Sequence, residues 1–308
     1  MDGIRPAGTV SPMTRSSTPT AGHWDLACAT AVASAAAHEH SLLGPVELVR
    51  LARTAVFRVG DVAIKVIPTT HRTHADVVCE AQLVAYLHAA GIAVPAPVGT
   101  YRAGDDFTVT ASEFVAHTSG APMPWGALGE AVAGLHAVAV PDFVPPWTDR
   151  RPVYLQRLTD LVGSGRLSPG QAARLVGQLV GQLAPPPAAT GAVINHGDLN
   201  SGNILVSAGQ LTLVDWELAR AAGPEMDLSG IANRGHRYGA SARDLDDFCA
   251  GYGVADLESF PGSAAWGAAR DLGGITYLLG CPGVAHRSEG QRRLRDVLDG
   301  TRSIWVDQ

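Results

Sequence analysis

The sequence is most informative at residues 196–206, HGDLNSGNILV, which are followed by LVDWE at residues 213–217. Asp198 precedes Asn203 by five positions, and Asp215 follows a short apolar segment. Sites that transfer phosphoryl groups use this order, because one carboxylate accepts a hydroxyl proton while an amide and a second carboxylate hold Mg²⁺. The pattern therefore predicts Asp198 as general base and Asn203 and Asp215 as oxygen ligands of Mg²⁺.

A predicted β-hairpin connects these residues. Apolar residues 204–206 and 211–214 flank a turn near Gly209-Gln210, so the second strand is expected to bring Asp215 back beside Asn203. The alternative is an ordinary polar turn, since Gly, Asp, Asn and Ser are common turn residues. The joint order of spacing, apolar strands and terminal aspartate favours the phosphoryl-transfer interpretation.

Lys65 is the single lysine of the chain, so the other basic residues among the 23 Lys and Arg are arginines. It ends VAIK at residues 62–65, in a segment whose alternation predicts a strand. In kinases, the lysine of a VAIK-type strand contacts the α- and β-phosphates of the nucleotide and pairs with a glutamate on the next helix. Glu80, in the predicted helix 74–90, is the expected partner. The alternative is a lone lysine on a solvated strand edge.

These motifs and several weaker ones together resemble the aminoglycoside phosphotransferase family of the protein-kinase-like superfamily, which includes choline and homoserine kinase relatives. The similarity runs from about residue 48 to about residue 229. It rests on residues 54–66, Glu80, SEFV at 112–115, Leu135-His136, residues 196–206, residues 214–218 and GPEMDL at 223–228.

The resemblance implies an α+β, two-lobed protein-kinase-like fold, with a small N-terminal lobe of antiparallel sheet plus helix and a larger, mainly helical C-terminal lobe. It implies ATP or GTP as co-substrate with Mg²⁺, and an adenine-binding hinge from Glu113 to Val115 that acts mainly through backbone groups. It also implies that His196 and Asp227 support the catalytic loop without touching substrate.

Two departures from protein kinases indicate a small-molecule substrate. The segment near residues 49–56, where the nucleotide loop is expected, contains no glycine and cannot be a G-x-G-x-x-G loop. Only seven residues separate Asp215 from Gly223, and no A-P-E follows. This leaves no room for the activation segment on which a protein substrate docks.

Composition is that of one soluble enzyme. The net charge of −6 is spread along the chain, without the clustered basic face that nucleic acid requires. The four cysteines are isolated, which predicts reduced thiols and a cytoplasmic location. The apolar run 27–37 is too short to span a membrane, so neither nucleic acid nor membrane is an expected partner.

We divide the chain into a disordered tail (1–22), a nucleotide-binding N-lobe (23–115) and a C-lobe (116–308) with the catalytic loop and the acceptor site. The spacing predicts the elements of both lobes. Expected helices are 23–40, 74–90, 125–138, 153–162, 168–183, 228–238, 242–252, 264–279 and 289–305, and expected strands are 46–51, 54–59, 63–67, 98–102 and 107–113.

The sequence thus predicts transfer of the γ-phosphoryl group of ATP or GTP to a hydroxyl of a small molecule, such as an aminoglycoside or another antibiotic. Alternatives are a choline- or homoserine-type metabolic kinase and a kinase-fold protein that binds ligand without turnover. The identity of the acceptor stays open, because the segment expected to bind it has mixed charge. The charged residues of that segment are Arg234, His236, Arg237, Arg243, Asp244, Asp246 and Asp247. The oligomeric state also stays open.

Overall fold

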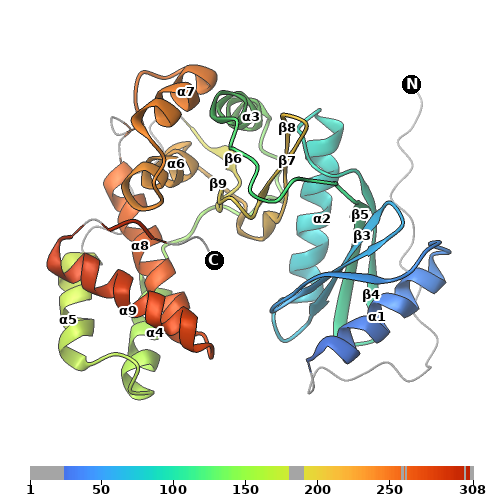
Figure 1. The fold of residues 1–308 in the computed structure, drawn as a ribbon, viewed down its shortest axis with the longest axis horizontal. Coiled ribbons are helices and arrows are strands. Elements are labelled where there is room, and N and C mark those ends of the chain that lie inside the picture. The colour runs from blue at the N-terminus through green and yellow to red at the C-terminus, as the bar shows by residue number, and fades with distance from the viewer. Residues whose placement is uncertain (1–23, 180–190, 258–259, 261, 302, 306–308) are drawn as a thin grey trace. The chain divides into compact units, whose positions relative to one another are not determined.

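The computed structural model describes residues 24–179, 191–257, 260, 262–301 and 303–305 (Figure 1). The predicted tail, residues 1–22, lies outside the described residues. Within the described ranges, no helix is long and apolar enough to cross a membrane.

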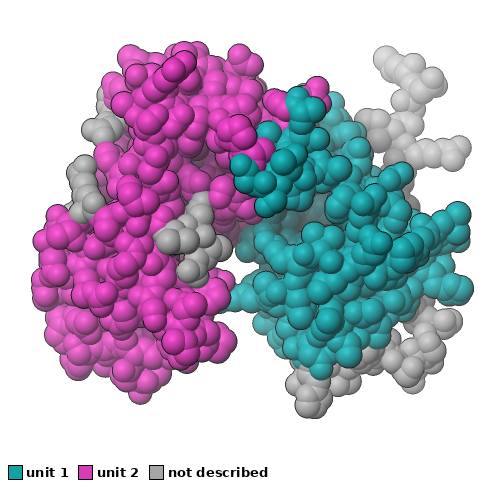
Figure 2. All heavy atoms as spheres, in the orientation of Figure 1, with its two compact units in different colours: residues 1–120, 205–208, 212–217 teal, residues 121–204, 209–211, 218–308 magenta. Residues whose placement is uncertain are grey.

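The chain forms two compact units (Figure 2). Unit 1 comprises residues 1–120, 205–208 and 212–217, and unit 2 comprises residues 121–204, 209–211 and 218–308. The segment around the predicted hairpin thus contributes to both units.

Unit 1 contains a five-stranded sheet with the order β1-β2-β3-β5-β4, in which every neighbouring pair is antiparallel. The sheet and its helices α1 and α2 agree with the predicted small lobe. The bounds are α1 (Leu26–Glu39), β1 (Glu47–Leu51), β2 (Ala55–Val59), β3 (Val62–Pro68), α2 (His74–Ala89), β4 (Pro97–Ala103) and β5 (Phe107–Glu113).

The alternation of β3 explains where Lys65 lies. Ile64 and Val66 are buried in one core cluster with the alanine-rich face of α1. Because successive side chains of a strand point to opposite faces, Lys65 lies on the other face of the sheet. There it is opposite Thr110 of β5. The sheet therefore separates an apolar face under α1 from a face that carries the amino group.

The catalytic segment folds locally as predicted. Strands β7 (Ile204–Ser207) and β8 (Gln210–Leu213) form a two-stranded sheet. Their two-residue loop has positive φ at both positions, 48° at Ala208 and 80° at Gly209. That combination is the type I′ turn that suits the twist of a tight hairpin.

Unit 2 is mainly helical, as the predicted fold class requires. Two short strands, β6 and β9, pair with each other and were not predicted, since three residues are too few to show alternation. The elements of this unit are α3 (Trp125–Ala137), α4 (Arg151–Gly163), α5 (Pro169–Gln178), β6 (Val193–Asn195), the 3₁₀ turn η3 (Trp216–Leu218, shared with unit 1), β9 (Arg220–Ala222), α6 (Glu225–Arg237), α7 (Ala242–Tyr252), α8 (Ser263–Gly280) and α9 (Val284–Asp299).

The predicted last helix, 289–305, was wrong at both ends. Helix α9 begins at Val284 and ends at Asp299, because Gly300 adopts φ 68° and caps it in the left-handed conformation. Trp305 is buried, and its Nε1 donates a hydrogen bond to Asp296 Oδ2 at 2.9 Å. Trp305 thus packs back onto the helix.

Glycine allows helices α3 and α7 to approach closely. A Cβ atom built on Gly129 of α3 meets Phe248 O and lies 2.7 Å from Tyr252 N of α7. A methyl group there displaces backbone, which cannot yield as a side chain does. The contact matters for the site, because α3 carries His136 and α7 carries Tyr252.

This packing yields a stability prediction. Gly129→Ala should lower the free energy of unfolding by about 1–3 kcal/mol, the usual cost of overpacking, although alanine favours helices. Gly267→Ala is the control, since a Cβ on this residue of α8 meets nothing within 4 Å. That change should instead stabilise by up to about 1 kcal/mol. Urea unfolding of both variants measures the difference, and equal effects would contradict the helix–helix contact.

Candidate active site

The buried carboxylate of Asp227 holds the loop that precedes Asp198. The loop donates two backbone N–H groups to it, from His196 to Oδ2 at 2.7 Å and from Gly197 to Oδ1 at 2.8 Å. Asp227 lies in the first turn of α6, where the helix dipole favours negative charge. Gly197 has φ 85°, and a Cβ on it meets Leu218 O, so only glycine fits.

Side chains from three other elements complete this support. Asn195 accepts a hydrogen bond from Asp227 N at 3.1 Å and donates to Ala222 O at 3.2 Å. His136 Nε2 lies 3.5 Å from Asp227 Oδ2, and its Nδ1 lies 2.8 Å from Tyr252 Oη. Burial raises the pKa of Asp227, but the adjacent His136 imidazole, together with His196 and Arg270, outweighs burial, so the pKa lies below its usual value. The carboxylate therefore stays ionised at neutral pH.

Asp198 and Asn203, which the sequence placed in one site, are in contact. Asn203 Nδ2 donates to Asp198 Oδ2 at 3.1 Å and to the backbone oxygen of Asp198 at 3.0 Å. Asp198 N donates to Nδ1 of the buried His196 at 3.3 Å. The amide nitrogen of Asn203 thus faces Asp198, and the amide oxygen Oδ1 is the atom of this side chain that can bind a metal ion.

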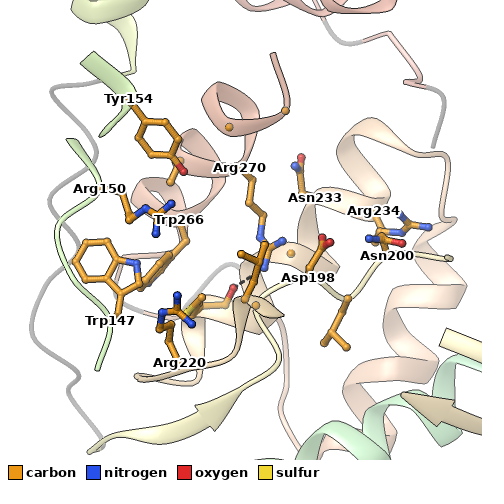
Figure 3. Close-up of a pocket in the computed structure, with 18 of the residues that line it drawn as sticks. Trp147, Arg150, Tyr154, Asp198, Asn200, Arg220, Asn233, Arg234, Trp266 and Arg270 are labelled. Carbon is orange, nitrogen blue, oxygen red and sulfur yellow. Dashed lines mark hydrogen bonds between the residues drawn. The ribbon is translucent and has the colours of Figure 1, made fainter. Parts of the chain in front are cut away.

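Asp198 lies on the wall of a cavity of about 300 Å³ within unit 2 (Figure 3). The sequence did not reveal most of the residues that line this cavity, because they come from separate segments without a common spacing. Besides Asp198 and Asn200 they include two tryptophans, two tyrosines and four arginines: Trp147, Trp266, Tyr154, Tyr238, Arg150, Arg220, Arg234 and Arg270.

The predicted nucleotide-side residues Lys65 and Asp215 meet in unit 1. Lys65 Nζ lies 2.7 Å from Asp215 Oδ1, and both side chains are mostly buried. Burial lowers the pKa of Lys65, but the carboxylates of Glu80, Asp215 and Glu217 outweigh it and raise the pKa above its usual value. Asp215 itself has φ 67°, a conformation that few residues other than glycine adopt.

The expected ion pair between Lys65 and Glu80 is not formed. Glu80 pairs instead with Nη1 of Arg72, which also lies 3.8 Å from Glu217 Oε2. Arg72 stands just before α2, whose first turn Thr73 caps, and its planar guanidinium can reach both carboxylates. Glu80 therefore raises the pKa of Lys65 by electrostatic attraction, without a direct contact.

The predicted hinge residues lie at the end of β5. Glu113 pairs with Val62 in the sheet and donates its N–H to Ala96 O at 2.8 Å. Val115 O lies 3.2 Å from His117 Nδ1. These contacts order the segment, and its role toward adenine stays a prediction.

The phosphotransferase enzyme family matches residues 48–271 of the chain. No curated protein sequence matches it significantly.

Solved structures of similar fold share little sequence with the chain. An amicoumacin kinase has 17% identity and a TM-score of 0.65 over 89% of this chain and 95% of its own. A spectinomycin phosphotransferase has 16% identity and a TM-score of 0.63 over 83% and 92%. A choline/ethanolamine kinase family protein from Mesorhizobium loti has 19% identity and a TM-score of 0.64 over 87% and 94%. At such identities the similarity establishes the fold.

The Lys65–Asp215 contact predicts an unusual titration. Lysine-selective ¹³C and ¹⁵N labelling gives one side-chain signal, because the chain has one lysine. Its NMR titration should have a midpoint above the usual value of about 10.4, and Asp215→Asn should lower the midpoint. Because the pKa is raised in the folded state, the contact stabilises the folded chain fully below about pH 10.4. This stabilisation is lost as the pH rises through the folded-state pKa. A midpoint below that of the urea-unfolded chain would contradict the contact.

Proposed function

Because the chain belongs to the phosphotransferase enzyme family, whose members phosphorylate hydroxyl groups of small molecules, we propose that it transfers the γ-phosphoryl group of ATP or GTP to a small-molecule hydroxyl. One observation carries this proposal. The Asp198 carboxylate, held by Asn203, faces a cavity of a size suited to a small molecule.

In this proposal Asp198 accepts the proton of the acceptor hydroxyl as the oxygen attacks the γ-phosphorus. The bond from the γ-phosphorus to the bridging oxygen breaks, and the nucleoside diphosphate leaves. Asn203 orients the carboxylate by its amide hydrogen bond, and Asp227 holds the backbone N–H groups of His196 and Gly197. Catalysis is then mainly positioning and electrostatics.

The donor atoms fit Mg²⁺, which prefers oxygen ligands and completes its shell with phosphate oxygens and water. Asn203 keeps Oδ1 for this role, because its amide nitrogen bonds Asp198. Asp215 offers a carboxylate that is ionised beside the charged Lys65. When bound, the ion neutralises negative charge on the transferred group. Lys65 is proposed to contact the nucleotide phosphates, and residues 113–115 the adenine.

The acceptor class is the open part of the function. Solved structures of this fold include a kinase named for amicoumacin, a phosphotransferase named for spectinomycin and a protein named for choline and ethanolamine. An aminoglycoside or other antibiotic, and a metabolic choline- or homoserine-type substrate, are thus all compatible with the fold. A binding protein without turnover is disfavoured, because the chain has the lysine, asparagine and both aspartates that the reaction needs.

The direct test follows transfer of γ-labelled phosphate from ATP and from GTP. The acceptors to be screened are aminoglycosides, other antibiotics, choline, amino acids and hydroxy acids. Labelled product with any of them supports the proposal. Nucleotide binding with no transfer to any acceptor class would favour the binding protein.

Asp198→Asn should lower kcat by about a hundredfold or more while nucleotide affinity changes little, because the base acts on the acceptor. Single-turnover transfer assays and calorimetric nucleotide titration separate the two effects. Asp247→Asn, at an exposed position of α7 away from the cavity, is the matched control and should leave both unchanged. An Asp198→Asn enzyme with more than about a tenth of wild-type kcat would contradict the general-base role.

Lys65→Arg should not preserve activity, although it keeps the charge. The ammonium of Lys65 is a compact group 2.7 Å from Asp215, and a planar guanidinium has neither its size nor its geometry. We expect kcat/KM for the nucleotide to fall about tenfold or more, as for loss of a charge-assisted contact. Arg102→Lys on exposed β4 is the reciprocal control and should behave as wild type. Full activity of Lys65→Arg would remove Lys65 from the nucleotide site.

A further inference from the structure

We propose that the cavity beside Asp198 selects acceptors that carry an anionic oxygen group, a carboxylate above all, on a planar apolar body. This inference rests on the proposed function, because it assigns the chemical class of the acceptor. The cavity belongs wholly to unit 2, so its lining is defined within one compact unit.

The charges around the cavity are the first argument. Among the described residues that line it, Asp198 is the one carboxylate, and it is the proposed base. Four arginines line the same cavity: Arg150, Arg220, Arg234 and Arg270. A polycationic acceptor needs several carboxylates around it, whereas this surplus of guanidinium groups attracts an anion.

The structure also resolves the mixed charge that the sequence left open. Arg234 lines the cavity, whereas Asp244 binds the Ser241 backbone as part of a helix cap. Arg237 pairs with Asp271 at 3.0 Å. The acidic residues of α7 are not among the described residues of the cavity wall. The local balance that a ligand meets is therefore basic.

Unpartnered donors are the second argument. The Nε atoms of Arg150 and Arg270 and Nε1 of Trp266 are buried and have no hydrogen-bond partner in the described part of the chain. All three residues line the cavity, and Trp266 is only 6% exposed. Buried donors without acceptors are costly, and each is a donor that can interact with oxygen. A ligand with carboxylate oxygens supplies the acceptors that these groups lack.

Arg270 is held in place before any ligand binds. Its Nη2 donates to Met226 O of α6 at 2.9 Å (Figure 3). A Cβ atom on Gly230, one helical turn further along α6, lies 2.6 Å from Arg270 Cζ. The guanidinium thus occupies the space that a side chain at position 230 normally fills. Such pre-organisation reduces the entropy lost on binding.

The apolar part of the wall indicates the body of the acceptor. The rings of Trp147 and Trp266 meet edge to face, with centroids 5.0 Å apart. In the view of Figure 3, these rings and Arg150 lie at one side, and Asp198 lies at the other. A planar ring between them places a hydroxyl near the base and an anionic group near the arginines. A cavity of about 300 Å³ is at the small end of ligand pockets.

The test uses three matched probes with one scaffold and three charges: 4-(hydroxymethyl)benzoate, 4-(hydroxymethyl)benzamide and 4-(hydroxymethyl)benzylamine. Calorimetric titration without nucleotide measures binding independently of turnover. We expect the carboxylate to bind about tenfold or more tightly than the amide, and the ammonium compound to bind weakest. Equal affinities, including equal lack of binding at millimolar concentration, or tightest binding of the ammonium compound, would overturn the inference.

Two variants from different segments of the cavity wall locate the effect. Arg270→Gln in α8 and Arg150→Gln before α4 should each lower affinity for the benzoate about tenfold and leave the benzamide nearly unchanged. Circular dichroism and thermal unfolding identify a variant that fails to fold, in which case the other one decides. Arg243→Gln, on the exposed face of α7, is the control and should change neither affinity. A carboxylate preference that survives in every folded variant contradicts the assignment.

Phosphoryl transfer to the same probes separates this inference from the proposed function. A charge preference in binding without transfer to any acceptor supports the anionic site and contradicts the kinase. Transfer to a cationic acceptor, with no preference for the benzoate, supports the kinase and contradicts the anionic site.

Discussion

The candidate site in unit 2 depends on one buried ion. Asp227 fixes two consecutive N–H groups of the loop that carries Asp198, and its charge is maintained by His136 and by the first turn of α6. An alanine there leaves the two donors without this acceptor, which costs free energy in the folded state. The close approach of α3 and α7 positions His136 and Tyr252. It therefore helps to hold the loop that carries Asp198, although neither helix contains that loop.

The aspartates of the two units differ in their partners. The carboxylate of Asp215 forms an ion pair with Lys65 at 2.7 Å, an arrangement that suits the metal-ligand role proposed for it. The carboxylate of Asp198 accepts a hydrogen bond from the neutral amide of Asn203, an arrangement that suits the general-base role proposed for it. The two proposed roles thus correspond to two different surroundings of the same residue type, as in other enzymes that assign different tasks to two carboxylates.

Local patterns predicted most of the fold. Alternation identified β3 and placed Lys65 on it, and turn chemistry predicted the hairpin before Asp215. Spacing within one loop placed Asp198 and Asn203 in one site, although it did not predict the hydrogen bond between them. Three features could not be predicted. The pairing of Glu80 depends on how far the Arg72 side chain reaches. The strands β6 and β9 form only because they meet each other. The cavity wall gathers tryptophans and arginines from distant segments, and tertiary packing alone brings those together.

The backbone of Asp215 limits how this position can change in evolution. At φ 67°, asparagine and glycine are accepted with little strain, but both remove the negative charge. Glutamate keeps the charge and incurs about 1–3 kcal/mol of conformational strain, with a longer side chain beside Lys65. No single substitution preserves both the conformation and the charge. Sequence drift at this residue therefore has no neutral path as long as the proposed metal ligand is under selection.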